Sequence, residues 1–226
     1  MNLLRNMHRL KYYLSASYRR KMLDKLLASH VDLYRGRVMD IGGKDRGAFT
    51  KPRHNVDEWF VVDITPSNEP DLLADVCDLS ELENEQFNVV NATELFEHVS
   101  DPEQGLRECV RVLKTGGTMI ISMPFLFPIH ADPSDFQRWT EHKWQQEAAA
   151  VGLEIEELIP MGRYFTVFMD MWKTFVRIMP LRPVKWVCYL TYPLCDLITK
   201  FDNFGFVQRS TLGNYTTGYY IVACKR

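Results

Sequence analysis

The sequence lacks a cysteine framework. Its cysteines are odd in number, and no two of them form a Cys-x-x-Cys pair. This pattern argues against a disulfide scaffold and against a zinc site built on paired cysteines, and it is typical of thiols in a reducing compartment. We therefore expect no metal site and five free thiols, Cys77, Cys109, Cys188, Cys195 and Cys224.

Long hydrophobic runs are also missing. No segment reaches the roughly 18 apolar residues of a membrane span, and the basic first thirty residues contain no apolar stretch typical of a signal peptide. The formal net charge of −2 gives no overall electrostatic reason to bind nucleic acid. The sequence thus predicts a cytoplasmic protein with no nucleic-acid partner.

A third absence is the dinucleotide fingerprint Gly-x-Gly-x-x-Gly. Instead, the apolar run RVMDI (37–41) leads from Asp40 into a turn that contains Gly42, Gly43 and Gly47. A nicotinamide oxidoreductase is disfavoured, because its pyrophosphate needs the missing spacing at a helix N-terminus. The glycines still let the backbone approach a ligand closely, which favours a ligand without phosphate.

Short apolar runs alternate with helical patterns along the 226 residues. One helix is expected after Asp101, a capping residue followed by Pro102, and another between the cap Thr140 and the stop Gly152. This alternation predicts an α/β, doubly wound, mostly parallel sheet that binds ligands at the carboxyl ends of its strands. The runs that we assign to strands after the first are 58–64, 70–76, 87–92, 117–124, 153–160 and 218–225.

Asp63 ends the second of these strands. In this kind of fold, a carboxylate at that place can accept hydrogen bonds from both ribose hydroxyls. An aspartate there is, taken alone, equally well explained as a turn residue. Together with the glycine turn, it favours a nucleoside ligand.

Several segments resemble the class I S-adenosylmethionine-dependent methyltransferases, in the type 11-like branch that includes enzymes of quinone, glycan and natural-product pathways. They are VMDIGG, FVVDI, ADVCDLSEL, the stretch from FNVVNATELFEHVSDP to RVLKTGGTMIISMPF, and GYYIVACKR. The resemblance implies a seven-stranded Rossmann-like sheet in one domain, 1–226. Its parts would be an N-terminal helical extension (1–35), a cofactor-binding core (36–160), a helical insertion or lid (161–213) and the last strand (214–226).

The resemblance also implies S-adenosylmethionine as the cofactor. It assigns Asp63 to the ribose, Asp75 and Val76 to the adenine, and the residues of the glycine turn and of 91–93 to the methionine portion; Ile64 adds the apolar slot that adenine needs. Lys44 departs from the family turn Asp-x-Gly-x-Gly-x-Gly, because it stands at the second glycine. The full set is Asp40, Gly42, Gly43, Asp63, Ile64, Asp75, Val76, Asn91, Ala92 and Thr93.

The departure at Lys44 leaves two functions open. If the lysine reaches the cofactor carboxylate, the protein is a methyltransferase, with O-methylation of a small molecule, sugar or lipid-linked glycan as the expected reaction. If the lysine crowds the cofactor out, the protein is a methyltransferase-fold binding or regulatory protein without turnover.

Two clusters follow the fourth and fifth strands, where the acceptor would meet the cofactor. For Glu97 and His98 in the first cluster we favour a packing role, whereas Glu94 is left open. In the second, His130 is the candidate base for a hydroxyl acceptor, oriented by Asp135, while Arg138 binds an acidic group of the acceptor or holds the loop. The alternative is a His-Asp-Arg network that only anchors the loop.

The insertion is aromatic and basic. Two short helices are expected, one before and one after the break at Pro180 and Pro183. Residues 163–210 contain seven Arg or Lys and three Asp. The stripe is compatible with a lid on the sheet edge, a homodimer contact, or a peripheral membrane contact. Its apolar members are Phe165, Phe168, Met169, Trp172, Phe175, Val176, Met179, Trp186, Tyr189, Leu190 and Leu194.

Overall fold

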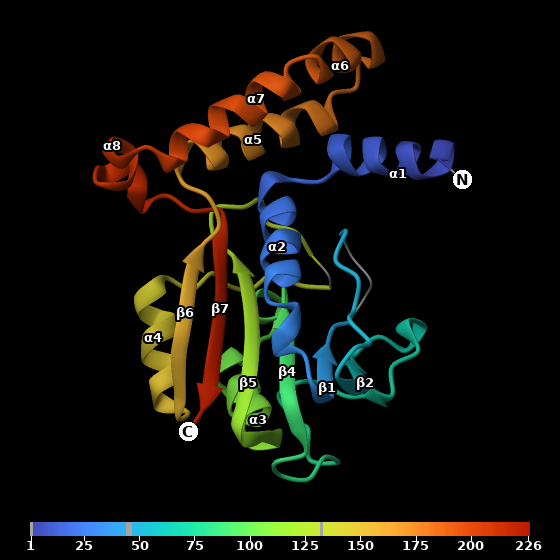
Figure 1. Ribbon diagram of the computed structural model, residues 1–226, viewed down its shortest axis with the longest axis vertical. Helices are drawn as coiled ribbons and strands as arrows, with labels where there is room; N and C mark the ends of the chain where they lie inside the picture. The colour runs from blue at the N-terminus through green and yellow to red at the C-terminus, as the bar shows by residue number, and fades with distance from the viewer. Residues whose placement is uncertain (1, 44–46, 132) are drawn as a thin grey trace.

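A computed structural model describes residues 2–43, 47–131 and 133–226 (Figure 1). Within these residues, seven strands form one sheet in the order β3-β2-β1-β4-β5-β7-β6. Only β7 runs antiparallel to its neighbours, so the predicted doubly wound, mostly parallel fold is confirmed. The strands are β1 (Gly36–Ile41), β2 (Val56–Asp63), β3 (Leu72–Leu73), β4 (Phe87–Thr93), β5 (Leu113–Pro124), β6 (Leu153–Pro160) and β7 (Gly218–Lys225).

The sheet is covered on both faces, as its continuous apolar strands predict. Val89 and Val90 are both fully buried, yet they belong to different core clusters because successive side chains of a strand point to opposite faces. Val90 packs in the cluster of α3 (Pro102–Val112) and α4 (Glu141–Ala150), and Val89 packs in that of α2 (Tyr18–Ser29).

Helix ends follow the predicted caps. The Asp101 carboxylate accepts a hydrogen bond from the Gln104 amide at 2.9 Å at the start of α3. The Thr140 hydroxyl accepts one from the Lys143 amide at 3.3 Å at the start of α4. Strand prediction was less accurate over 70–76, where only Leu72 and Leu73 pair with β2.

A helical layer lies beyond the carboxyl ends of the parallel strands (Figure 1). It contains α1 (Asn2–Ser15), α5 (Tyr164–Ile178), α6 (Arg182–Tyr189), α7 (Tyr192–Ile198) and α8 (Gly205–Gln208). The helical extension expected before the sheet is present as α1 and α2. We expected two helices in the insertion, but its described part forms four, α5 to α8. Pro193 lies in the first turn of α7, a position that proline favours.

Charged side chains of α5 and α7 contact the end of α1 and the start of α2. The Lys173 ammonium donates to the Tyr13 carbonyl at 3.0 Å, and Asp170 accepts from the Tyr18 amide. The Asp196 carboxylate accepts from the hydroxyls of Tyr13 and Tyr18, at 2.7 and 2.6 Å. The layer is therefore fixed to the body by polar contacts. No helix within the described residues is both long and apolar enough to cross a membrane, and the assignment of 1–226 to one domain stays a prediction.

Candidate functional site

A cavity of about 310 Å³ lies at the carboxyl ends of β1, β2 and β4. Leu27 and Arg20 of α2 form part of its wall, and the loop containing Ser134 and Phe136 forms another part. No residue of the helical layer borders it among those described. The cavity thus occupies the place where open α/β sheets bind their ligands.

The glycine turn after β1 is shaped for close approach. Gly42 has a φ of +67°, which glycine adopts without strain, and a Cβ at Gly43 would lie 2.4 Å from Asp40 Oδ2. The Asp40 carboxylate is held from two sides: its Oδ1 accepts from Asn91 Nδ2 at 2.7 Å, and its Oδ2 lies 2.7 Å from Lys51 Nζ. The turn therefore presents a fixed, backbone-lined edge to the cavity.

Asp63 serves the turn after β2 and also borders the cavity. Its Oδ1 accepts from the Thr65 amide at 2.8 Å, and its Oδ2 accepts from Asn68 Nδ2 at 2.7 Å. These bonds fix the carboxylate while each oxygen keeps acceptor capacity. The turn role and the ligand role considered from the sequence are therefore compatible.

The remaining predicted cofactor residues are placed as follows. Ala92 does not border the cavity, because it is fully buried in the core. Lys44 lies outside the described residues. Those that border the cavity are Asp40, Gly42, Gly43, Asp63, Ile64, Asp75, Val76, Asn91 and Thr93.

Two cations border the cavity that the sequence analysis missed. Lys51 Nζ also donates to the Gly43 carbonyl at 3.1 Å, and Arg20 reaches the cavity from α2. The basic run YRRK (18–21) was a visible signal, but its contact with the sheet depends on how α2 packs. Local patterns do not give that packing.

Glu94 is buried beside the cavity in a left-handed conformation, with φ of +57°. Arg19 pairs with its carboxylate, and the Ser122 hydroxyl donates to Oε1 at 2.9 Å. Burial acts to raise the pKa of Glu94, but Arg19 and Arg20 outweigh it and hold the pKa below its usual value. Glu94 is therefore a paired carboxylate at neutral pH.

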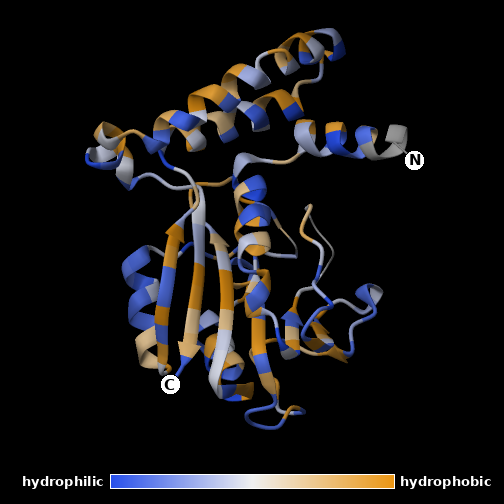
Figure 2. Ribbon diagram, in the orientation of Figure 1, coloured by the Kyte–Doolittle hydropathy of each residue, from blue (hydrophilic) through white to orange (hydrophobic). Residues whose placement is uncertain are grey.

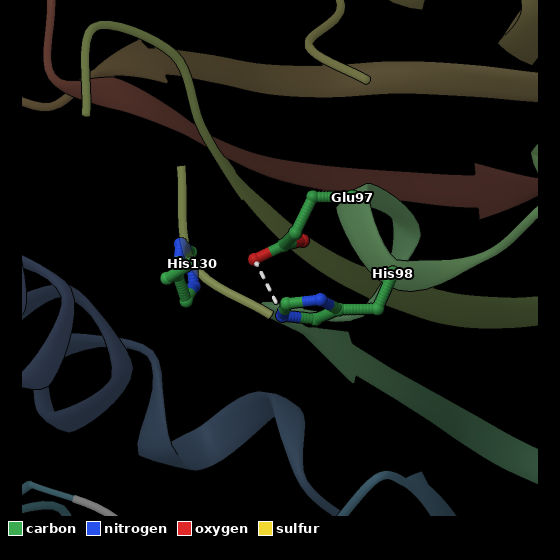
Figure 3. Close-up of side chains that lie close together, drawn as sticks. All are labelled: Glu97, His98 and His130. Atoms are coloured by element: carbon green, nitrogen blue, oxygen red, sulfur yellow. Dashed lines mark ion pairs between the residues drawn. The ribbon is translucent and has the colours of Figure 1, made fainter. Parts of the chain in front are cut away.

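Glu97 behaves in the opposite way. It is fully buried, and neither carboxylate oxygen has a hydrogen-bond partner among the described residues. Burial, with the Glu94 carboxylate adding to it, raises the pKa of Glu97 to about 8. At neutral pH this carboxyl is mostly protonated, 3.7 Å from His98 Nε2 (Figure 3).

His98 borders the cavity. Its Nδ1 lies 2.5 Å from the Ser134 carbonyl, an acceptor, so we assign a proton to Nδ1. The other ring nitrogen, Nε2, has no hydrogen-bond partner among the described residues. Nε2 is buried and lies beside the Glu97 carboxyl.

Glu97, His98 and His130 are the residues of the described chain that could gather around a metal ion (Figure 3). One ligand atom from each lies within 4.8 Å of the others. Tetrahedral ligands of a zinc ion lie about 3.3 Å apart. A cation would have to draw the three side chains together and displace the Glu97 proton, and the absence of a metal site stays a prediction.

The three predicted acceptor-side residues do meet. His130 Nδ1 lies 3.4 Å from Asp135 Oδ2, and Arg138 Nη2 donates to the same oxygen at 2.6 Å. Arg138 lowers the pKa of Asp135 to about 2, and burial lowers the pKa of His130. However, none of the three borders the cavity: the His130 ring meets His98 edge-on, with centroids 5.1 Å apart.

Comparison with known proteins gives partial matches in sequence. Residues 53–121 match the family model described as a methyltransferase domain. A ubiquinone biosynthesis O-methyltransferase of Hahella chejuensis is 29% identical over 121 residues, which are 53% of this chain and 41% of the relative. One of Marinobacter nauticus is 33% identical over 93 residues, 41% of this chain and 30% of the relative. The chain thus spans less than half the length of these curated relatives.

Solved structures match over most of the chain. The [4+2]-cyclase SpnF has a TM-score of 0.57 at 16% identity, over 90% of this chain and 79% of that one. A putative methyltransferase of Bacillus halodurans has a TM-score of 0.53 at 16% identity, over 89% and 98%. The geranyl diphosphate C-methyltransferase of Streptomyces coelicolor, solved with S-adenosylhomocysteine, has a TM-score of 0.56 at 11% identity, over 90% and 77%. At such identities the likeness concerns the fold.

Proposed function

We propose that this chain, which resembles the class I methyltransferases in its motifs, its matched domain and its fold, transfers a methyl group from S-adenosylmethionine to a small-molecule acceptor. The observation that carries the proposal is the cavity at the carboxyl ends of the strands. It combines the Asp40 glycine turn, Asp63 and Asp75 around one space. Each lies where the sequence resemblance assigns a part of the cofactor.

The residues present fit S-adenosylmethionine. Asp63 can accept from the ribose hydroxyls, and Asp75 can accept from the adenine amine beside the apolar side chains of Ile64 and Val76. The glycine turn supplies a close backbone edge for the methionine portion. S-adenosylmethionine, when bound, supplies an electrophilic methyl carbon.

Arg20 and Lys51 complete this assignment. Both cations border the cavity: Lys51 contacts Asp40 and Gly43 at the glycine turn, and Arg20 lies 3.7 Å from the Glu94 carboxylate. A zwitterionic amino-acid group needs a positive partner for its carboxylate as well as an acceptor for its amine. We assign the first role to these two cations and the second to Asp40.

For a hydroxyl acceptor, His98 is the proposed base. Its ring borders the cavity, with Nε2 buried 3.7 Å from the Glu97 carboxyl, whereas the His130 ring does not border the cavity and meets the His98 ring edge-on. The Ser134 carbonyl fixes the His98 tautomer, and the neutral Glu97 avoids placing a second negative charge beside the acceptor. Asp135 and Arg138 would then hold the loop that carries His130.

O-methylation is the more specific part of the proposal. It rests on the O-methyltransferases among the partial relatives and on the imidazole at the cavity. A sugar or lipid-linked glycan remains the proposed acceptor class, since hydroxyl groups are their abundant nucleophiles. The competing function, a methyltransferase-fold protein without turnover, rests on the departure at Lys44.

A labelled-methyl assay tests the proposal. The purified chain is incubated with methyl-labelled S-adenosylmethionine and panels of hydroxylated lipids, sugars and phenols, and products are read by mass spectrometry. We expect label on an acceptor oxygen and release of S-adenosylhomocysteine. Failure of the folded chain to bind the cofactor contradicts the proposal and supports the non-catalytic alternative, in which Lys44 crowds the cofactor out. Binding of S-adenosylmethionine argues against that alternative.

A further inference from the structure

The helical layer has an apolar outer surface as well as an apolar inner one. On α5, Met169 and Val176 are buried against the body. A second apolar row runs along the exposed side of the same helix at spacings of three and four residues, the period of one helix face. This row is 47–70% exposed and consists of Phe168, Met171, Phe175 and Ile178.

Other helices of the layer also expose large apolar side chains. On α6, Trp186 and Val187 are 66% and 64% exposed, and Leu190 after it is 79% exposed. On α8, Phe206 is 63% exposed. Figure 2 shows apolar residues along α5, α6 and α7. Monomeric proteins rarely expose so many large apolar side chains, which marks the layer as a contact surface.

The charges of this surface have one sign. All three carboxylates of residues 161–217 are turned inward: Asp170 and Asp202 are buried, and Asp196 binds two tyrosine hydroxyls. Lys173, counted from the sequence among the surface cations, is also buried. The cations that remain exposed across the insertion are Arg177, Arg182, Lys200 and Arg209.

The α1 helix adds to the same charge. It exposes Arg9 and Lys11, together with Met7 and Leu10 at 59% and 58% exposure. The whole stretch from residue 2 to residue 23 contains no acidic residue. In the described part of the layer, apolar side chains and cations therefore share the surface with no exposed carboxylate.

We propose that the helical layer docks on the surface of an anionic lipid bilayer. Apolar side chains at this surface would enter the boundary between headgroups and acyl chains, while the cations would meet anionic headgroups. Contact through the same layer with a second copy of the chain would instead bring two positive surfaces together with no exposed carboxylate between them. The charge thus favours lipid as the occupant.

The position of the layer gives this docking a consequence. The layer lies beyond the carboxyl end of the sheet, the end at which the cavity lies (Figure 1). Docking holds that end of the molecule against the bilayer. The inference does not depend on methyl transfer, because it rests on the layer alone.

Vesicle co-sedimentation tests the docking. One set of vesicles is phosphatidylcholine, and the other contains one part phosphatidylglycerol to two parts phosphatidylcholine. We expect the chain to sediment with the anionic vesicles at least about tenfold better than with the neutral ones, with binding that weakens as salt screens the charges. No sedimentation with anionic vesicles at low salt overturns the proposal.

Variants assign the binding to the layer. Trp186→Ser with Leu190→Ser removes two exposed apolar groups, and Arg177→Glu with Arg182→Glu reverses two exposed charges. Each pair should reduce partitioning by about tenfold or more at an unchanged melting temperature.

The matched control is Arg53→Glu with Arg107→Glu, which changes the net charge equally at exposed sites outside the layer. It should keep most of the binding of the parent. If the control lost as much vesicle binding as the layer variants, the binding would depend on net charge alone, and the layer would not be the docking surface. If the parent did not bind vesicles but formed a dimer in sedimentation velocity, and only the layer variants were monomeric, the layer would be the contact with a second copy of the chain.

Discussion

At the scale of single residues, the Asp63 carboxylate holds the turn after β2 and also borders the cavity. We predict that Asp63→Ala weakens S-adenosylhomocysteine binding about 10- to 100-fold, because it removes a charged hydrogen-bond acceptor. The melting temperature should fall as well, since Thr65 and Asn68 lose their acceptor. Calorimetry measures the affinity, with the exposed Glu83→Ala as control. An unchanged dissociation constant in Asp63→Ala would remove Asp63 from the site.

The two histidines give a second prediction. His98→Asn should lower the methylation rate about 100- to 10,000-fold, the usual contribution of a general base, and leave cofactor affinity within about twofold. His130→Asn should have the smaller effect, because His130 does not border the cavity. Single-turnover rates on the identified acceptor measure both. The reverse order would restore His130 as the base, as the sequence analysis expected.

Glu97 gives a prediction about stability and pH. Its pKa is about 8 in the folded chain and about 4.5 when unfolded, so the folded state binds the extra proton between these values. The contribution of Glu97 to the free energy of unfolding therefore falls as pH rises from about 4.5 to 8. Glu97→Gln, which stays neutral, should remove this part of the pH dependence in urea titrations. If the free energy of unfolding of Glu97→Gln depended on pH in the same way as that of the parent, Glu97 would be ionised in the folded chain.

At the scale of secondary-structure elements, the start of α5 depends on a distant carboxylate. Asp202 accepts hydrogen bonds from the amides of Arg163, Phe165 and Thr166, at 2.8, 2.9 and 3.0 Å. We predict that Asp202→Ala lowers the free energy of unfolding by about 2–4 kcal/mol, because it leaves one buried and two partly buried amides without this acceptor. Urea denaturation measures this, and the exposed neighbour Asn203→Ala should change it by less than about 0.5 kcal/mol. Equal effects in the two variants would contradict this capping role.

The caps show what a sequence can predict about elements. Asp101 and Thr140 were predicted correctly because each bonds an amide three residues further on. The cap of α5 could not be predicted, since Asp202 comes from a segment that reaches α5 only in the folded chain. The same applies to Arg20 and Lys51 at the cavity.

At the scale of the whole molecule, alternation of strands and helices was enough to predict the sheet and the edge at which its cavity lies. The glycine turn and Asp63 were found because they sit at the ends of strands along one edge. The outer face of α5 was misjudged, because one stripe was expected where the helix has both a buried row and an exposed row. Hydrophobic spacing identifies a helix face but does not say what covers it.

The measurement that tests the central claim most directly is calorimetric titration of the chain with S-adenosylhomocysteine, with S-adenosylmethionine as competitor. If the cavity is a methyltransferase cofactor site, one molecule binds per chain, S-adenosylmethionine competes for the same site, and Asp63→Ala weakens both. Absence of binding by a folded chain, or binding that Asp63→Ala leaves intact, would contradict the account.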